Sequence, residues 1–280
     1  MFIISQNQEV TEIKMSRTFL GKPLYFCHAF LIDGLLVDTG LIHEEKRFDR
    51  FLKTSNINQA VITHHHEDHT GNLHLLNRMG IIPYAHYKAI KPVKEGFYLY
   101  PYQKYLWGVP YKAAVKPVVE IIETDKFKFK AIETPGHSDD HIVLLNENNG
   151  WLFGGDFYLS SRLQYLRNDE DLNSMIASTE KVLKYDFEII FDGLKGAVNS
   201  GKTRVLQKLN WLYDVKGEVL RLAEQGIDAD QIAKIVFQKD GIFAIFTQKH
   251  FSKKYFVTSI LKSVNPVRKL GRRFKTPPKL

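Results

Sequence analysis

Alternation of hydrophobic and polar positions predicts strands and helices in turn along most of the chain. The runs "LYFCHAFLI" and "LLVD" flank an Asp-Gly pair, which indicates a β-hairpin. In "HEEKRFDRFLKT", Phe48, Phe51 and Leu52 fall on one helical face. For the first part of the chain we predict strands at 24–32, 35–38 and 59–63 and helices at 43–54 and 69–80.

The middle of the chain begins with a less regular stretch. Residues 82–118 are rich in aromatic residues, contain five prolines and predict no clear element. Regular patterns then return, with strands near 118–123, 127–133, 142–146, 151–154 and 187–191 and a helix at 170–184. Strands separated by helices in both halves indicate an α/β protein whose sheets are covered by helices.

From residue 201 the pattern is that of helices alone, so the sequence predicts two parts and a tail. Val205, Leu209 and Leu212 begin an apolar stripe, and Asp228 with Gln231 resembles a capping box that opens the next helix. We expect an α/β domain at 1–200, a helical extension at 201–265 and a basic tail at 266–280.

Composition narrows the class of protein and the partners. With 44% hydrophobic and 25% charged residues, the 280-residue chain is typical of globular proteins. The single cysteine, Cys27, cannot form an internal disulfide, and no leader or apolar run of about 20 residues is visible, which favours the cytoplasm. The formal charge is +8, but six of the basic residues lie in the acid-free tail. A solvated tail is favoured over one that binds nucleic acid or an acidic partner.

A cluster of ligand-type side chains follows the strand at 59–63, in the segment "THHHEDHTGN". His64 and His66 point the same way if the strand end stays extended, so both imidazoles can reach one ion. Asp68 and His69 come after a turn and can address a neighbouring position. By itself the segment could be a solvent-facing histidine run.

Two distant segments make that simpler interpretation less favourable. "TPGHSDDH" (134–141) places His137 after a Pro-Gly turn at a strand end, and "LFGGDFYL" (152–159) places Asp156 after a strand and two glycines. A core histidine or a capping aspartate would explain either one alone. All three segments together indicate a metal site.

These segments resemble those of the metallo-β-lactamase superfamily, which contains glyoxalase II-like thioester hydrolases and lactonases. "HHHEDH" (64–69) is similar to its His-x-His-x-Asp-His motif, and "TPGHS", "GGD" and "LVDTG" (36–40) match other parts of its pattern in the same chain order. The resemblance covers about residues 20–200. It implies an αββα sandwich with the metal site along one edge.

The resemblance also implies how the ligands are divided. His64, His66 and His137 would bind one metal, Asp68 and His69 a second, and Asp156 both. Nitrogen and carboxylate ligands suit one or two zinc ions, with iron or manganese as alternatives. A metal-bound hydroxide would attack a small ester, thioester or lactone, and Asp68 would accept or deliver a proton.

One position departs from the family's pattern. Where a late ligand histidine is expected, the turn "IIFDGLKGAV" (189–198) has Leu194, which cannot bind metal. A hydrolase with a weak second metal site is the first interpretation. A mononuclear iron oxygenase similar to persulfide dioxygenases, holding iron through His64, His137 and Asp156, remains open, as does a weakly active or non-catalytic relative with a binding role.

Further residues receive supporting roles. His141 and Asp38 are expected to support the ligands without binding metal. The aromatic stretch lies between two ligand segments, so Tyr102, Tyr105 and Trp107 form either a substrate lid or a small satellite core. A small molecule is the expected substrate, and a homo-oligomer remains open.

Overall fold

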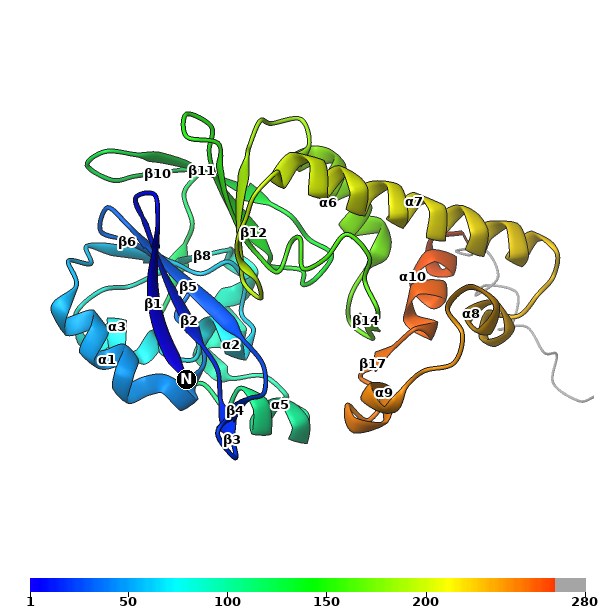
Figure 1. Cartoon of the computed structure of the whole chain (residues 1–280), viewed down its shortest axis with the longest axis horizontal. Helices are drawn as coiled ribbons and strands as arrows, with labels where there is room; N and C mark the ends of the chain where they lie inside the picture. The colour runs from blue at the N-terminus through cyan, green and yellow to red at the C-terminus, as the bar shows by residue number, and fades with distance from the viewer. Residues whose placement is uncertain (265–280) are drawn as a thin grey trace, which may run out of the picture.

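Two β-sheets face each other in the computed structural model, which describes residues 1–264 (Figure 1). The first sheet has the order β1 (Phe2–Asn7), β2 (Val10–Met15), β5 (Cys27–Ile32), β6 (Leu35–Val37), β7 (Gln59–Val61), β8 (Tyr84–Ala85) and β9 (Lys116–Pro117). The second has the order β10 (Ile121–Glu123), β11 (Lys128–Glu133), β12 (Ile142–Asn146), β13 (Trp151–Gly155), β15 (Ile189–Asp192) and β16 (Gly196–Val198).

Strand pairing is mixed in both sheets. In the first, the ladders from β1 to β6 are antiparallel, and those that join β6, β7, β8 and β9 are parallel. In the second, only the ladder between β13 and β15 is parallel. Parallel neighbours end at the same edge of a sheet, so several strand ends are brought together there.

An apolar core fills the space between the two sheets, and side chains alternate between it and the outer layers. Leu35 and Val37 point into the inter-sheet core, whereas Leu36 packs on the helices behind the first sheet. In the inter-sheet core, Phe30 and Phe191 meet edge to face with ring centroids 5.4 Å apart. This period of two fixes which side chains of each strand face the inter-sheet core and which face the helices.

Helices cover the outer face of each sheet. The first is covered by α1 (Glu45–Thr54) and α3 (Leu73–Arg78), and the predicted stripe of Phe48, Phe51 and Leu52 is buried there. The second is covered by α6 (Leu172–Val182) and the start of α7 (Gly201–Glu224). The predicted αββα sandwich is therefore confirmed.

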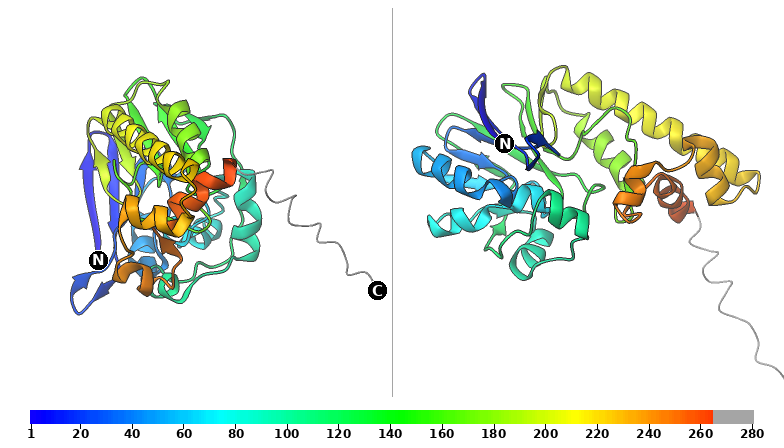
Figure 2. Two further views of the ribbon diagram at one scale, coloured as in Figure 1. Left: turned by 90° about the vertical axis from the view of Figure 1, so that its right-hand side faces the viewer. Right: turned by 60° about the horizontal axis from the view of Figure 1, so that its bottom comes forward.

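The chain beyond residue 200 is mainly helical and packs on α6. It contains α7, α8 (Ala229–Phe237), α9 (Ile242–Phe246) and α10 (Lys254–Val264). Leu212, Ile232 and Phe256 bury one continuous apolar cluster with Leu172 and Ile176 of α6. A short strand, β17 (Phe251–Ser252), also pairs with β14 (Leu166–Arg167), so the segment is not purely helical. In Figure 2, α7 runs out from the sandwich and the chain returns toward it.

Several local predictions were wrong or incomplete. The strands β1 and β2 were not predicted, because "MFIISQNQEV" has little alternation. The helix expected at 69–80 is divided at Gly71 and Asn72 into α2 (Glu67–Thr70) and α3. Residues 82–118 are more regular than expected, with β8, β9, α4 (Ile90–Glu95) and α5 (Pro101–Leu106). The remaining strands, β3 (Thr18–Phe19) and β4 (Lys22–Pro23), form a separate hairpin.

No helix among residues 1–264 is both long and apolar enough to cross a bilayer. The predicted tail at 266–280 lies outside the described residues, as does the last residue of the predicted extension. The cytoplasmic location and the two-part division of the chain stay predictions.

Candidate metal centre

The predicted ligands lie just after strand ends that meet at one edge of the sandwich. His64 follows β7 of the first sheet, and His137 and Asp156 follow β11 and β13 of the second. Hydrogen bonds tie the two sheets together here, because the Ile142 amide donates to the Thr63 carbonyl across 2.8 Å. Residues far apart in sequence are thus held on short, fixed segments.

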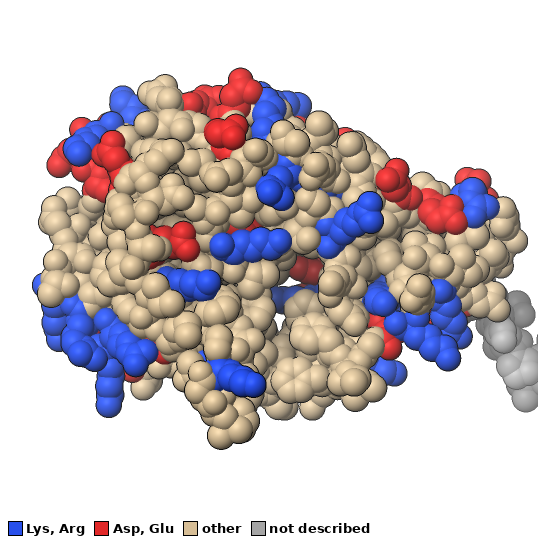
Figure 3. Space-filling view, in the orientation of Figure 1, with Lys and Arg blue, Asp and Glu red and all other residues tan. Residues whose placement is uncertain are grey.

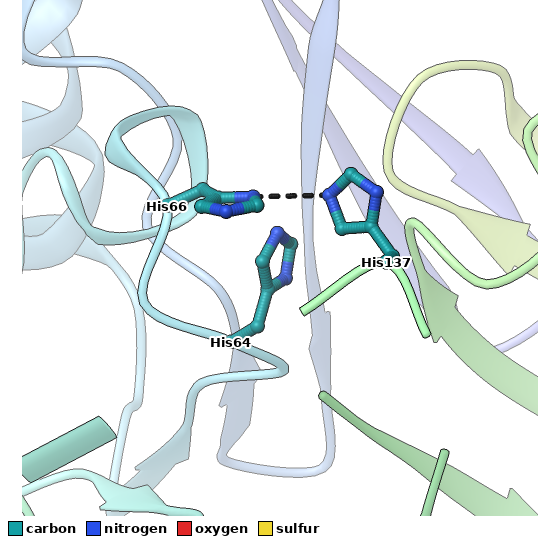
Figure 4. A group of neighbouring side chains, drawn as sticks. All are labelled: His64, His66 and His137. Atoms are coloured by element: carbon teal, nitrogen blue, oxygen red, sulfur yellow. Dashed lines mark hydrogen bonds between the residues drawn. The ribbon is translucent and has the colours of Figure 1, made fainter. Parts of the chain in front are cut away.

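Three histidines form the first group. Nδ1 of His66 and Nε2 of His137 are 3.0 Å apart, and the His64 ring lies beside both (Figure 4). One ring nitrogen from each residue falls within 4.8 Å of the other two, and all three side chains are buried. Three convergent imidazoles can surround one cation.

A second group shares His64 and adds His69 and Asp156, again with ligand atoms within 4.8 Å of one another. Asp156 lies between the two groups: Oδ1 is 3.3 Å from Nε2 of His69, and Oδ2 is 3.3 Å from Nε2 of His137. The Asp68 carboxylate is farther out, with Oδ1 3.8 Å from Nε2 of His69. The structure therefore brings all six predicted ligands together.

Unpaired nitrogens supply a test of whether these residues suit a metal. Nε2 of His64 and Nε2 of His69 are buried and form no hydrogen bond, although Nε2 of His69 lies 3.3 Å from Oδ1 of Asp156. A buried nitrogen without a partner, as in His64, is costly unless something else satisfies it. Burial, with the neighbouring His69, holds the pKa of His64 well below its usual range. His64 is thus neutral at pH 7 and offers a free lone pair. The donor set fits a divalent cation.

Hydrogen bonds behind the ligands orient their rings. Nδ1 of His69 lies 2.7 Å from Oδ2 of Asp38, and Nδ1 of His137 lies 2.6 Å from Oε1 of Glu170. In both residues Nε2 is therefore directed to the centre. Carboxylates placed in this way fix the tautomer of a ligating histidine and raise its basicity.

His141 has both ring nitrogens in use. Nδ1 is 2.8 Å from the Thr134 hydroxyl, and Nε2 accepts a hydrogen bond from the Asp156 backbone amide. No nitrogen remains free for a cation, and the contact instead holds the backbone of Asp156 in place.

Two glycines let the backbone pass close to these side chains. A Cβ on Gly155, which has φ +48°, would lie 2.5 Å from the Thr63 hydroxyl. A Cβ on Gly193 would lie 2.7 Å from Cε1 of His69 and 2.8 Å from Oδ1 of Asp156. The turn that carries Leu194 thus passes beside the His69 and Asp156 side of the centre, where the family's late histidine is expected.

A cavity of about 80 Å³ opens beside the ligands, lined by Asp68, His137 and Asp156 together with apolar and aromatic groups. Among the latter are Tyr25, Trp107, Leu163, Tyr165 and, from the C-terminal segment, Phe251. Arg167 and His66 line this cavity and also a second, outer one of about 310 Å³. Arg167 therefore lies between the metal centre and the outer cavity.

The residues proposed as a lid differ in their positions. Trp107 lines the inner cavity and is mostly buried. Tyr102 lies behind it, with its hydroxyl 2.6 Å from Nδ1 of His250, and belongs to the apolar core. Tyr105 faces outward under the Arg17 guanidinium. Only Trp107 of the three contacts the cavity, because α5 turns the two tyrosines to other faces.

Sequence reasoning missed Tyr25, Arg167 and Glu170. The charged run "RNDED" between Asp156 and α6 is a signal, but a run of this kind is usually a solvated surface. Here the β14–β17 ladder draws it inward, so that Arg167 and Glu170 are buried. His65 also has an unexpected contact, since it bonds Asp140 and so links the two ligand loops.

Comparison with known proteins agrees with this geometry. The family model of the metallo-beta-lactamase superfamily matches residues 23–191, more than half of the chain. The chain belongs to this superfamily. A similar fold is found in a beta-lactamase domain protein from Burkholderia ambifaria, which aligns with a TM-score of 0.70 and 18% identity over 93% of this chain and 88% of that one.

Curated relatives of this superfamily member have names of metal-dependent hydrolases and thioesterases. The probable metallo-hydrolase YqjP of Bacillus subtilis is 28% identical over 39% of this chain and 42% of its own length. The atrochrysone carboxyl ACP thioesterase of Claviceps purpurea is 29% identical over 53% of this chain and 43% of its own length. The chain thus spans less than half the length of either relative.

Proposed function

We propose that the protein is a metal-dependent hydrolase of a small ester, thioester or lactone. The observation that carries the proposal is the convergence of the buried Nε2 atoms of His64 and His69, neither of which forms a hydrogen bond, beside the Asp156 carboxylate. A thioester is the favoured substrate class, because one of the relatives is named a thioesterase.

In this proposal His64, His66 and His137 would hold one ion, Asp68 and His69 would hold a second, and Asp156 would serve both. Zinc is the metal that the nitrogen and carboxylate donors suit best. When bound, the metal supplies Lewis acidity toward the substrate carbonyl and an activated water at neutral pH.

The protein's own groups orient and enclose the reaction. Asp38 and Glu170 hold the rings of His69 and His137. A carboxylate oxygen of Asp68, on the cavity wall, accepts a proton from the attacking water and returns it to the leaving group. Tyr25 and Trp107 exclude bulk water from this side and contact the acyl group.

We also propose that the second ion is the more weakly held. With leucine at position 194, the ligands that we assign to the second position among residues 1–264 are Asp68, His69 and Asp156. Three protein ligands suffice for catalytic zinc, but one fewer donor lowers affinity.

The proposal is tested by metal analysis and thioester hydrolysis on the same samples. His64→Ala and His137→Ala are each expected to lose bound metal and to lower kcat/KM by at least about a thousandfold. The matched control is His74→Ala, since His74 bonds Glu45 on the outer helices and should leave both measurements unchanged. His65→Ala is a poorer control because of its bond to Asp140.

If metal analysis finds iron and no thioester, ester or lactone is hydrolysed, the result contradicts the proposal and favours an oxygenase. Full metal content without any turnover would instead favour a binding role.

A further inference from the structure

One end of the molecule exposes large apolar side chains that contact little protein. Leu20 is 86% exposed at the tip of the β3–β4 hairpin, and Ile242 and Ile245 of α9 are 85% and 75% exposed. We call the group formed by Phe19, Leu20, Tyr105, Ile242, Ile245 and Phe246 the apolar face; each is exposed by at least 39%. Exposed apolar patches of this kind mark interaction sites.

The backbone at the hairpin tip makes an exposed leucine less expected. Leu20 has φ +49°, a left-handed conformation that glycine or asparagine adopts more easily. A leucine at this position favours neither the conformation of the tip nor burial of the side chain. A requirement for an apolar side chain that projects from the surface explains the leucine.

Contacts join the three segments of the apolar face into one surface. The Arg17 side chain at the base of the hairpin donates to the Tyr105 carbonyl and lies 4.2 Å from its ring centroid. On the other side of α5, the rings of Tyr102 and Phe246 are 6.0 Å apart. The hairpin, α5 and α9 accordingly lie at the same end of the molecule in Figures 1 and 2.

The charge within the three segments that form the apolar face is almost entirely positive. The segments 17–24, 98–111 and 239–249 contain Arg17, Lys22, Lys104, Lys239 and Lys249. Their one acid, Asp240, has its two carboxylate oxygens engaged, by the Ser252 hydroxyl and the Lys253 amide. In Figure 3 the lower edge, where these segments lie, is mostly tan with blue groups and little red.

We propose that the apolar face docks the protein on the surface of an anionic lipid bilayer. Apolar tips that enter the interface, ringed by lysines that meet anionic headgroups, are the features that such binding needs. A second copy of the chain fits less well, because two copies of one basic surface would repel each other. The docked face adjoins the metal cavity through Tyr102, which contacts the cavity residue Trp107.

The test is flotation of the full chain with vesicles of phosphatidylcholine mixed with phosphatidylglycerol, and with vesicles of phosphatidylcholine alone. We expect the protein to float with the mixed vesicles. At low salt, binding to vesicles without phosphatidylglycerol should be at least tenfold weaker. Leu20→Asp and the double variant Ile242→Asp, Ile245→Asp should each weaken binding at least tenfold. Each of Lys22→Gln and Lys249→Gln should weaken it about fivefold.

Matched controls separate this surface from other causes. Val119→Asp places the same charge at another exposed apolar position, in the loop between β9 and β10, and should bind as the unchanged chain does. Retained thermal unfolding midpoints show that the variants still fold.

Three results would overturn the proposal. The first is no flotation with either vesicle. The second is a loss of vesicle binding when glutamine replaces Arg268, Lys269, Arg272 and Arg273, together with unchanged binding in Leu20→Asp. That result would assign the binding to the tail. The third is a dimer, seen by sedimentation without lipid, that the aspartate variants dissociate.

Discussion

At the scale of single residues, the His66 ring is contacted by Arg167 and by His137. Arg167 can only donate, and its Nη2 lies 2.9 Å from Nε2 of His66. Its Nη1 lies 3.3 Å from Nδ1 of the same ring, and Nδ1 is also 3.0 Å from Nε2 of His137. A cation bound through Nδ1 leaves the ring proton on Nε2, where it faces the Arg167 donor.

This conflict predicts that Arg167 weakens metal binding. Arg167→Gln removes a positive charge next to the centre and supplies a carbonyl that can accept from Nε2 of His66. We expect zinc affinity to rise by roughly tenfold, measured by competition with a chromophoric chelator. Arg204→Gln, at an exposed position on α7, should change nothing. Unchanged or weaker affinity in Arg167→Gln would show that the contact supports the metal-binding form.

A second residue-scale prediction concerns Leu194. Its neighbour Gly193 touches the His69 and Asp156 side of the centre, so an imidazole at 194 can complete that side. Leu194→His should raise zinc content after gel filtration from about one to about two ions per chain. Lys195→His is the matched control, since the Lys195 ammonium lies over the Tyr158 ring. Equal metal content in both variants would mean that the turn does not present position 194 to the metals.

At the scale of elements, one buried lysine joins α7 to the sandwich. Lys208 is fully buried, and its ammonium donates to the Phe157 carbonyl, just after the Asp156 ligand. Burial lowers the pKa of Lys208 to about 8, although Glu170 and Asp192 oppose the shift. The protonation of Lys208, which anchors α7 to the sandwich, therefore changes near pH 8.

The sign of that dependence can be predicted. Between about pH 8 and about pH 10 the unfolded chain holds more protons on this lysine than the folded chain, so stability from this group rises with pH. The free energy of unfolding of the unchanged chain, relative to Lys208→Met, should increase by about 1–3 kcal/mol over this range. Urea unfolding at both pH values measures it, with Lys216→Met on the same helix as control. A difference that stays constant or falls would contradict the lowered pKa.

Also at the element scale, the sequence could predict the strands that carry ligands better than the segments that enclose them. The runs before His64 and Asp156 are short and apolar, and the run before His137 alternates polar and apolar residues before a Pro-Gly turn. Each strand is therefore readable from the sequence. The contacts that bury Arg167 and Glu170 depend on pairing between β14 and β17, more than eighty residues apart. No local pattern records such a pairing.

At the scale of the whole molecule, the net charge of the sequence does not indicate where basic side chains gather on the folded surface. Much of the excess of +8 lies in the tail, and the remaining sequence reads as balanced. Folding nevertheless gathers Lys22, Lys104 and Lys249, from three separate segments, at one end of the molecule. Patterning indicates an α/β protein with helix-covered sheets, and the family resemblance implies the αββα sandwich. This distribution of charge, in contrast, appears only when distant segments are placed beside one another.

The β14–β17 ladder also sets an order of events during biosynthesis. The proposed metal ligands, from His64 to Asp156, leave the ribosome well before Phe251, which closes one wall of the cavity. If the centre holds ions as proposed, a nascent chain can acquire them while this side of the cavity is still open to solvent. The wall closes only after β17 has been translated and has paired with β14.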